Sequence, residues 1–401
     1  MRVTHVITRL IVGGAQENTI ASVLGLQNRP DLKVDLVSGP TAGPEGSLES
    51  LFATRPDMLR IEPALVRPVA PWKDVVALSR LTRLFRGTRP DIVHTHSGKA
   101  GILGRLAAAR ARVPVIVHTI HGPSFGAFQS SLANLVFRGA ERRAARVTTH
   151  FVVVAEAMKR QYLAAGIGTE SDYTRIFSGF DLQPFLAATN DSDLRARLGL
   201  QPTDVVIGKI ARLFKLKGHE DLLAVAPDLV QNNPRIKFLL VGGGEWRARF
   251  EAMAAAQGLK GHFIFTGLLA PQQVAPLMGI MDVVAHLSSR EGLARALPQA
   301  MAAGHPVVAY DSDGANEVCF EGETGFLVKA GDLRGLRNRL LELAQNAELR
   351  AQMGERGRAF VKSRFSVEEM VEAIYGLYQD LMRRGSWPIL PPTSLKSTAA
   401  R

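Results

Sequence analysis

The sequence is poor in cysteine, since Cys319 is the only one among 401 residues. A single thiol cannot close a disulfide within the chain or give a metal two thiolate ligands, so a reducing cytoplasm is the simplest compartment. Apolar runs stay well short of the roughly 20 residues that cross a bilayer, and no membrane span is expected. The strand pattern begins at Val3, so no secretion signal is expected. With 46% hydrophobic and 21% charged residues, the chain is expected to form about two globular domains.

The charge of the chain is unevenly distributed. The formal net charge is +12, of which residues 1–183 carry +9 and residues 184–401 carry +3. Such an excess indicates an anionic partner, either a phosphate-bearing substrate or an acidic membrane surface, although solvated arginines on helix faces account for it equally well. The sequence has neither zinc-finger spacing nor a basic stretch with interleaved aromatic residues, so no nucleic-acid partner is expected.

Short β-branched runs alternate with longer segments of helical spacing along nearly the whole chain. This alternation predicts an α/β fold with parallel sheets covered by helices on both faces, the doubly wound, Rossmann-like arrangement. Strands are expected at 3–8, 33–37, 91–95, 114–120, 150–154 and 174–178, and then at 204–210, 236–241, 262–266, 281–287, 306–310 and 325–328. Helices are expected over segments that include 99–110, 127–146, 218–232, 333–345 and 366–383.

A polar, proline-containing stretch at 183–203 separates the two sets of strands. We therefore expect an N-terminal domain over 1–183 and a C-terminal domain over 184–365. A helix over 366–383, expected to pack back on the N-terminal domain, is followed by a tail over 384–401 that is rich in Pro, Ser, Thr and Ala. Two such domains place a cleft between the carboxyl ends of their strands, where doubly wound sheets bind ligands.

Glycines and histidines follow several of the predicted strands. Gly13-Gly14 comes after the first strand, where glycines let backbone N–H groups approach an anion, although such turns are also common without a ligand. The fingerprint GxGxxG is absent, which argues against a nicotinamide dehydrogenase. His94 is expected to be hydrogen-bonded in the core, whereas His121 precedes a Gly-Pro turn and is the better candidate for the cleft. A metal would need a third ligand, for which His5 and His118 qualify only by count, so no metal is expected.

Charged side chains follow a strand of the second set. Arg212 ends this strand and Lys217 opens the next helix, which makes a guanidinium and an ammonium available to clamp a diphosphate. Lysines at helix starts are usually just solvated. A positive charge at the end that the helix dipole disfavours nevertheless makes a bound anion more plausible.

The segment 288–309 is the most informative part of the sequence. It combines a loop that contains Glu291, a helix of small residues and a buried strand. Glu291 is placed to bond sugar hydroxyls, while the amides of Gly292 and Leu293 can reach phosphate oxygens. Gln299 follows about two helical turns later, where its side chain could meet a ribose.

On these residues the chain resembles the retaining glycosyltransferases of family four, which have the two-domain GT-B arrangement of facing Rossmann-like sheets. The resemblance runs over nearly the whole chain, and the block 291–309 is its most specific part. It also includes Gly13-Gly14, Thr119-Ile120-His121-Gly122, Ser178-Gly179-Phe180-Asp181, Arg212, Lys217-Gly218, Leu240-Val241-Gly242-Gly243-Gly244 and Phe265-Thr266-Gly267.

The resemblance implies that the N-terminal domain over 1–183 binds the acceptor and that the C-terminal domain over 184–365 binds the nucleotide-sugar. It also implies roles for particular residues. In relatives the counterpart of Glu291 contacts the donor sugar, those of Arg212 and Lys217 hold the diphosphate, and that of His121 lies near the reacting centre, so these four are the expected catalytic residues. The residues expected to bind the donor are Gly13, Gly14, Arg212, Lys217, Gly267, Leu268, Glu291, Gly292, Leu293 and Gln299. Gln299 stands where the family often has a second glutamate. Its carbonyl can still accept from a ribose hydroxyl, so we expect weaker binding and not a loss of activity.

The implied activity is transfer of a sugar from a nucleotide-diphosphate sugar to a hydroxyl of a sugar or lipid-linked acceptor. A UDP-sugar is the expected donor, and the anomeric configuration is expected to be retained. No cofactor or metal is expected, because Arg212 and Lys217 would stabilise the leaving phosphate. The sequence Asp311-Ser312-Asp313 follows a different strand and is interpreted as a loop that flanks the donor. Synthesis of cell-envelope polysaccharide, lipopolysaccharide or glycolipid would then take place in the cytoplasm or at the inner face of the membrane.

Other activities remain open at this stage. A nucleotide-sugar epimerase or a phosphorylase could share the fold, and so could a non-catalytic protein that binds sugar nucleotides. Peripheral association with an anionic membrane is also considered for the segment 124–146, whose apolar face is otherwise ordinary core packing. Its apolar residues include Phe125, Phe128, Leu132, Leu135 and Phe137, beside Arg138, Arg142, Arg143 and Arg146.

Overall fold

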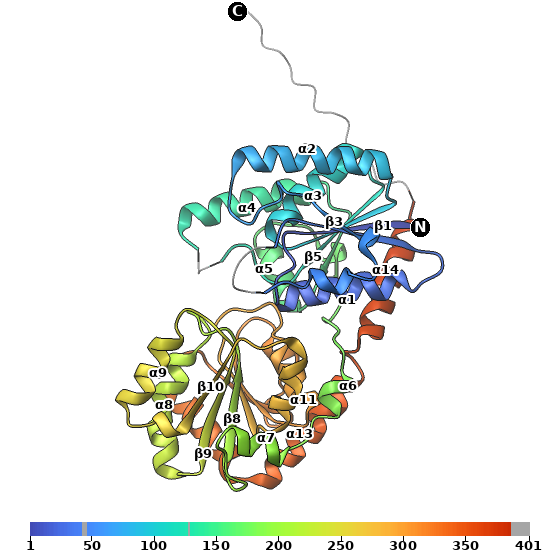
Figure 1. Cartoon of the computed structure of the whole chain (residues 1–401). Helices are drawn as coiled ribbons and strands as arrows, with labels where there is room; N and C mark the ends of the chain where they lie inside the picture. The colour runs from blue at the N-terminus through green and yellow to red at the C-terminus, as the bar shows by residue number, and fades with distance from the viewer. Residues whose placement is uncertain (42–45, 127–128, 386–401) are drawn as a thin grey trace, which may run out of the picture.

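The computed structural model describes residues 1–41, 46–126 and 129–385. Two parallel sheets, one of seven strands and one of six, form two domains that face each other (Figure 1). Helices lie on both sides of each sheet. The predicted fold class, two doubly wound parallel-sheet domains, is therefore confirmed.

The N-terminal sheet has the strand order β3-β2-β1-β4-β5-β6-β7. Its strands are β1 (Arg2–Ile7), β2 (Lys33–Ser38), β3 (Leu59–Ile61), β4 (Ile92–His96), β5 (Val115–Ile120), β6 (His150–Val153) and β7 (Tyr173–Arg175). Its helices are α1 (Gly14–Gln27), α2 (Pro71–Thr88), α3 (Gly98–Ala111), α4 (Ser131–Ala145) and α5 (Glu156–Ala164). The strand order reverses between β1 and β4, and such a switch point opens a crevice at the carboxyl ends of the strands.

The C-terminal sheet has the order β10-β9-β8-β11-β12-β13. Its strands are β8 (Val205–Ile210), β9 (Ile236–Val241), β10 (Phe263–Gly267), β11 (Val283–His286), β12 (Val307–Tyr310) and β13 (Gly325–Val328). Its helices are α8 (His219–Asn232), α9 (Arg247–Ala256), α10 (Val274–Gly279), α11 (Ala296–Ala302), α12 (Leu333–Gln345) and α13 (Ala347–Lys362). Short 3₁₀ helices occur at η1 (Glu49–Phe52), η2 (Pro56–Met58), η3 (Glu170–Asp172), η4 (Lys260–His262), η5 (Pro271–Gln273) and η6 (Ala315–Glu317).

The chain crosses between the domains twice. The first crossing leads into α6 (Gln183–Leu186) and α7 (Ser192–Arg197), and the second leads into α14 (Val367–Arg383). At the crossings the Phe180 N–H donates to the Phe365 carbonyl over 3.0 Å. Helix α14 returns to the N-terminal domain and packs beside α1, because its apolar stripe completes that core (Figure 1). The residues of this stripe are Met370, Val371, Ile374, Tyr378 and Leu381.

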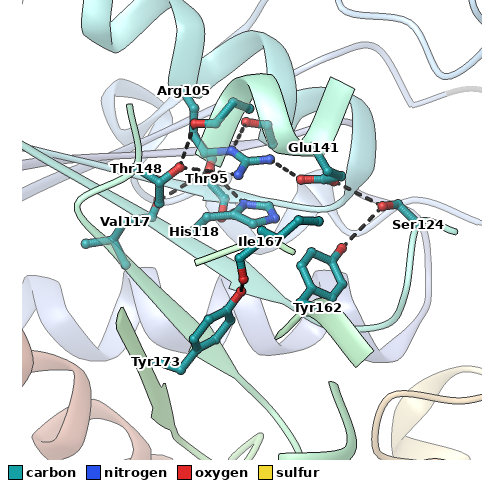
Figure 2. Close-up of polar contacts among 12 residues, drawn as sticks. Thr95, Arg105, Val117, His118, Ser124, Glu141, Thr148, Tyr162, Ile167 and Tyr173 are labelled. Carbon is teal, nitrogen blue, oxygen red and sulfur yellow. Dashed lines mark hydrogen bonds and ion pairs between the residues drawn. The ribbon is translucent and has the colours of Figure 1, made fainter. Parts of the chain in front are cut away.

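A fully buried ion pair joins two helices of the N-terminal domain (Figure 2). Arg105 on α3 donates from Nη2 to Glu141 Oε2 on α4 over 2.6 Å. Ser124 bonds the other carboxylate oxygen, and Arg105 Nε donates to the Gly101 carbonyl. The ion pair and these hydrogen bonds offset the large desolvation cost of burying both charges.

Several element boundaries differ from the sequence prediction. The edge strand β3 was not predicted, because three residues carry too little periodicity to be recognised. Strand β7 ends at Arg175, and the chain then turns towards the first crossing. Helix α4 begins at Ser131, where the Ser130 side chain caps the Ala133 N–H, so the predicted start at 127 is too early. Residues 127–128 and 386–401 lie outside the described part of the chain, as does Phe128.

Candidate active site

A cleft of about 580 Å³ lies between the two domains. Its volume is in the range typical of pockets that enclose a small organic ligand. The predicted site residues that line it are Gly13, Gly14, His121, Arg212, Lys217, Leu268, Glu291, Leu293 and Gln299. Two predicted residues are not in the lining. Gly267 forms an isolated β-bridge with the lining residue Gly242, and Gly292 lies against the backbone of His121. The structure therefore places nine of the eleven predicted residues in the cleft lining and the other two next to it.

The centre of the cleft holds an ion pair between Lys217 and Glu291. The Ser288 hydroxyl donates to Glu291 Oε1 over 3.2 Å, and the Glu291 N–H donates to Asp313 Oδ2 over 2.6 Å. Burial raises the pKa of the Glu291 carboxyl, but Lys217 and His286 oppose this effect and the net pKa is lowered. The carboxylate is therefore charged at neutral pH and its backbone is held in place.

Lys217 stands two residues before α8, which corrects the prediction that it opens this helix. Helix α8 begins at His219, and Leu216 and Gly218 on either side of Lys217 both have positive φ, of 69° and 66°. A Cβ at Gly218 would lie 2.2 Å from the Leu287 carbonyl oxygen. This tight backbone path points Lys217 into the cleft near the positive end of the α8 dipole, so the lysine needs an anionic partner.

The loop before α11 contacts the first domain directly. A Cβ at Gly292 would lie 2.0 Å from the His121 carbonyl oxygen, so only glycine fits there. Gly314 donates its N–H to the Gly292 carbonyl over 3.2 Å. This close approach puts Glu291 of one domain beside His121 of the other.

Two further contacts across the cleft were missed by the sequence analysis. Arg295 forms an ion pair with Glu17 of α1, and its side chain packs on Gly14, whose Cβ would lie 3.2 Å from Arg295 Cδ. Glu317 accepts bonds of 2.9 and 3.0 Å from the N–H groups of Glu156 and Ala157, at the start of α5. Each pair joins residues more than 150 positions apart, so no local sequence signal could have indicated it.

The glycine turn and His121 form the opposite wall of the cleft. Helix α1 begins at Gly14 and faces its N-terminal N–H groups towards the lining, a suitable arrangement for a phosphate. His121 Nε2 is bonded to His96 Nδ1 at 3.0 Å, and burial lowers the pKa of His121 to about 4. Its imidazole is therefore neutral at pH 7. His94 is buried and bonded to Tyr378 and Thr119, so the expectation that it belongs to the core is confirmed.

These residues together can hold an anion and orient a neutral, hydroxyl-rich group. Arg212 and Lys217 provide two positive charges on the side of the C-terminal domain, and Glu291 provides a hydrogen-bond acceptor next to them. Across the cleft, His121 and the start of α1 provide further polar contacts. Such a cleft suits a molecule with a diphosphate at one end and a sugar at the other.

Comparison with known protein families agrees with this arrangement. Residues 14–174 match the family model described as "Glycosyl transferase 4-like domain", and residues 190–360 match "Glycosyl transferases group 1". Together the two models cover most of the chain, and the protein therefore belongs to the family-four glycosyltransferases of the GT-B type. The resemblance expected from the sequence is confirmed.

Particular relatives extend over nearly the whole chain. The sequence is 27% identical over 390 residues to the UDP-Gal:alpha-D-GlcNAc-diphosphoundecaprenol alpha-1,3-galactosyltransferase of Escherichia coli, covering 95% of this chain and 97% of that protein. It is 23% identical to the capsular polysaccharide biosynthesis glycosyltransferase CapM of Staphylococcus aureus, covering 79% and 84%. The crystal structure of HepE from Anabaena in complex with UDP-glucose superimposes with a TM-score of 0.79 at 25% identity, covering 95% and 100%.

Proposed function

We propose that this glycosyltransferase moves a sugar from a UDP-sugar to a hydroxyl of a sugar or lipid-linked acceptor, with retention of anomeric configuration and without a metal. The observation that carries the proposal is the meeting of Arg212, Lys217 and Glu291 opposite the Gly13-Gly14 turn in one cleft. Cationic side chains, an acceptor for sugar hydroxyls and a phosphate-binding turn are the three groups that a nucleotide-sugar needs.

In the reaction, the acceptor oxygen forms a bond to the anomeric carbon as the bond from that carbon to the diphosphate oxygen breaks. The electron pair of the broken bond goes to the diphosphate, where Arg212 and Lys217 stabilise the growing negative charge. The acceptor hydroxyl gives its proton to the departing phosphate on the same face of the sugar, which retains the configuration. Lys217 would exchange its Glu291 partner for phosphate oxygens as the donor binds, leaving the carboxylate for sugar hydroxyls.

A UDP-sugar is preferred as donor because the E. coli relative is named for a UDP-galactose reaction and the HepE complex contains UDP-glucose. The names of the E. coli and S. aureus relatives also support an acceptor in the synthesis of envelope polysaccharide, such as a polyprenol-linked sugar. The same assignment extends to lipopolysaccharide or glycolipid synthesis, with the enzyme in the cytoplasm or at the inner face of the membrane.

The test begins with a thermal-shift screen of UDP- and GDP-sugars. A true donor at 100 times its dissociation constant should raise the free energy of unfolding by about 2.7 kcal/mol. Transfer from that donor is then measured on polyprenol-linked and free sugar acceptors, and NMR of the product reports the anomeric configuration. Activity that survives a chelator supports the metal-free mechanism, and an inverted product would contradict retention.

Lys217→Ala is expected to lower kcat by about 100-fold or more, because one stabilising cation at the leaving group is lost. Lys215→Ala is the matched control, since Lys215 belongs to the same loop but is exposed and outside the cleft lining. Equal activity of both variants would contradict the assigned site. Conversion of the donor to its epimer without any acceptor would indicate an epimerase instead.

We further propose that the N-terminal domain contacts an anionic membrane through α4. Leu132, Leu135 and Val136 are 73%, 70% and 59% exposed on this helix, and basic residues follow them along it. Apolar side chains beside arginines are the pattern of a helix that lies in a membrane interface. No helix in the described ranges of the chain is long and apolar enough to cross a bilayer.

The membrane contact is tested by sedimentation with vesicles that contain anionic or only zwitterionic lipids. Leu135→Ser is expected to reduce binding to anionic vesicles, while Leu333→Ser, at an exposed leucine of the other domain, serves as control. Binding that ignores lipid charge, salt and the Leu135 substitution would argue against the proposal.

A further inference from the structure

A column of imidazole rings lies behind His121 in the N-terminal domain. His5 of β1 stands opposite His94 of β4 in the parallel register, and His96 ends β4. The three rings are fully buried. His96 reaches His121 at the cleft, so the column connects the active site with the interior of the sheet.

Five hydrogen bonds join the members of this column into one chain. His121 Nε2 is 3.0 Å from His96 Nδ1, and His96 Nε2 is 2.9 Å from His5 Nδ1. His5 Nε2 is then 3.3 Å from the Tyr378 hydroxyl of α14. That hydroxyl is 2.5 Å from His94 Nδ1, and His94 Nε2 is 2.6 Å from the Thr119 hydroxyl.

The four imidazoles of this hydrogen-bonded column are neutral at pH 7. Burial lowers the pKa of His5 to about 3 and that of His121 to about 4. Burial, together with the neighbouring rings, lowers the pKa of His94 and His96 well below the ordinary value. Each ring therefore carries one proton, on either Nδ1 or Nε2.

Only two proton arrangements satisfy every bond of this chain. Each of the five bonds needs one proton. The three internal imidazoles supply one apiece, and so does the Tyr378 hydroxyl, because it is buried and has no other acceptor among the described residues. The fifth proton comes from one of the two ends, Thr119 or His121. If Thr119 supplies it, every imidazole proton is on Nδ1, whereas if His121 supplies it, every imidazole proton is on Nε2.

The Thr119 end decides between the two arrangements. Thr119 is buried, and among the described residues the bond to His94 is the one hydrogen bond of its hydroxyl. A buried hydroxyl proton without an acceptor is costly, so this hydroxyl donates to His94 Nε2. Each following member of the column must then donate to the next one in the same direction. His121 therefore accepts at Nε2 and carries its own proton on Nδ1.

The same histidines do not form a convincing metal site. One nitrogen each of His5, His94 and His96 lies within 4.8 Å of the others, which is close enough for a shared ion. However, these nitrogens already have hydrogen-bond partners within the column: His5 Nδ1 is bonded to His96 Nε2, and His94 Nδ1 to the Tyr378 hydroxyl. A shared ion would have to displace these bonds.

We propose that Thr119, His94, Tyr378, His5 and His96 are positioning residues that hold His121 as a neutral Nδ1–H donor towards the cleft. The proposal rests on the proposed function, in which this N–H would bond an oxygen of the donor substrate. Cooperative hydrogen bonds polarise one another, so the ordered chain strengthens the donor at its end. It also makes α14, from the far end of the sequence, part of the support of the active site.

The proton order is tested directly by NMR of protein labelled with ¹⁵N-histidine, in which long-range ¹H–¹⁵N couplings distinguish the two tautomers. The expected result at pH 7 is Nδ1–H for His5, His94, His96 and His121 together. An Nε2 proton on any of the four, or a stoichiometric metal ion in the purified protein, would overturn the proposal. Assignment uses the signals lost in single-histidine variants.

The effect on activity is tested with two substitutions of His96. His96→Leu removes the donor to His121 Nε2 and is expected to lower kcat about tenfold while the dissociation constant of UDP stays unchanged. His96→Asn places an amide N–H near the former Nδ1 and is expected to restore most of the rate. His150→Leu is the matched control, because His150 is a buried strand histidine outside the cleft lining.

The outcomes separate the inference from the proposed function. If the wild-type protein transfers no sugar from any donor, the proposed function fails, while the tautomers still decide the proton order. If transfer occurs and His96→Leu is as active as His150→Leu, the positioning role is refuted. A rate that His96→Asn does not restore also counts against it.

Discussion

The buried Lys209 offers a quantitative test of the electrostatics beneath the cleft. Lys209 lies on β8, is 1% exposed, and its Nζ has no hydrogen-bond partner among the described residues. Burial is the main cause that lowers its pKa from 10.5 to about 7, and the nearby Lys217 adds to the effect. Glu291 and Asp221 act in the opposite direction but do not restore the ordinary pKa. We predict that Lys209→Met stabilises the protein at neutral pH.

The size of the effect follows from the two pKa values. At about 1.4 kcal/mol per pKa unit, a pKa lowered from 10.5 to about 7 corresponds to a full penalty of about 5 kcal/mol, which is slightly smaller at pH 7, where the folded lysine is half protonated. Below the folded pKa both states hold the proton and the penalty is complete. As the pH rises from about 7 to 10.5, the folded state loses a proton that the unfolded state keeps, so stability rises until the penalty vanishes. Relaxation of the surrounding structure reduces this penalty. We therefore expect Lys209→Met to raise the free energy of unfolding by about 3 kcal/mol at pH 7 and by nearly nothing at pH 10.5.

The assay is urea unfolding between pH 6 and pH 10.5. The protein has three tryptophans, and replacing Trp72 and Trp387 by Phe leaves Trp246 as a reporter of the C-terminal domain. Lys237→Met is the control, since Lys237 lies on the neighbouring strand β9 with its Nζ 2.9 Å from the Gly261 carbonyl oxygen. Parallel pH profiles of Lys209→Met and the parent, or a variant less stable at pH 7, would refute the reasoning.

Three further predictions concern packing and domain contact. Gly292→Ala is expected to reduce transfer about 100-fold, because its Cβ would lie 2.0 Å from the His121 carbonyl oxygen and would force the Glu291 loop and His121 apart. Full activity in the transfer assay would contradict this. Glu141→Gln should lower the free energy of unfolding, measured with urea, by about 3 kcal/mol. The double variant Arg105→Met with Glu141→Leu should recover most of this loss, and additive losses would argue against a coupled pair. Glu317→Ala should raise the donor KM several-fold in steady-state kinetics with little change in stability, since it removes the bonds to α5; an unchanged KM would show that closure does not depend on them.

The fold was largely predictable because buried parallel strands read as continuous apolar runs, as at Val115–Ile120. The exceptions are short or strained. β3 has three residues on an edge, and Leu216 and Gly218 take positive φ values that delay the start of α8 past Lys217. Backbone strain of this kind is set by the tertiary contact with Leu287, which a local pattern does not reveal.

The candidate site was predictable where function follows strand ends. His121 comes directly after β5, and Glu291 lies in the loop that follows β11, so the sequence alone placed both in the cleft. The pairing of Arg295 with Glu17 was not predictable, because it depends on how the two domains face each other. The ordered column was missed for a similar reason, since the register that sets His5 opposite His94 is decided by the sheet and not by either strand.

The double crossing between the domains has a mechanical consequence. Because the segments at Phe180 and Phe365 are hydrogen-bonded to each other, we expect them to move together as one hinge and not as two independent connections. A single connection would allow the two domains to twist and slide against each other. Two bonded connections leave rotation about the axis through them as the easiest movement. Opening of the crevice would then separate Glu291 from His121 along one arc and return them to the same alignment with every turnover.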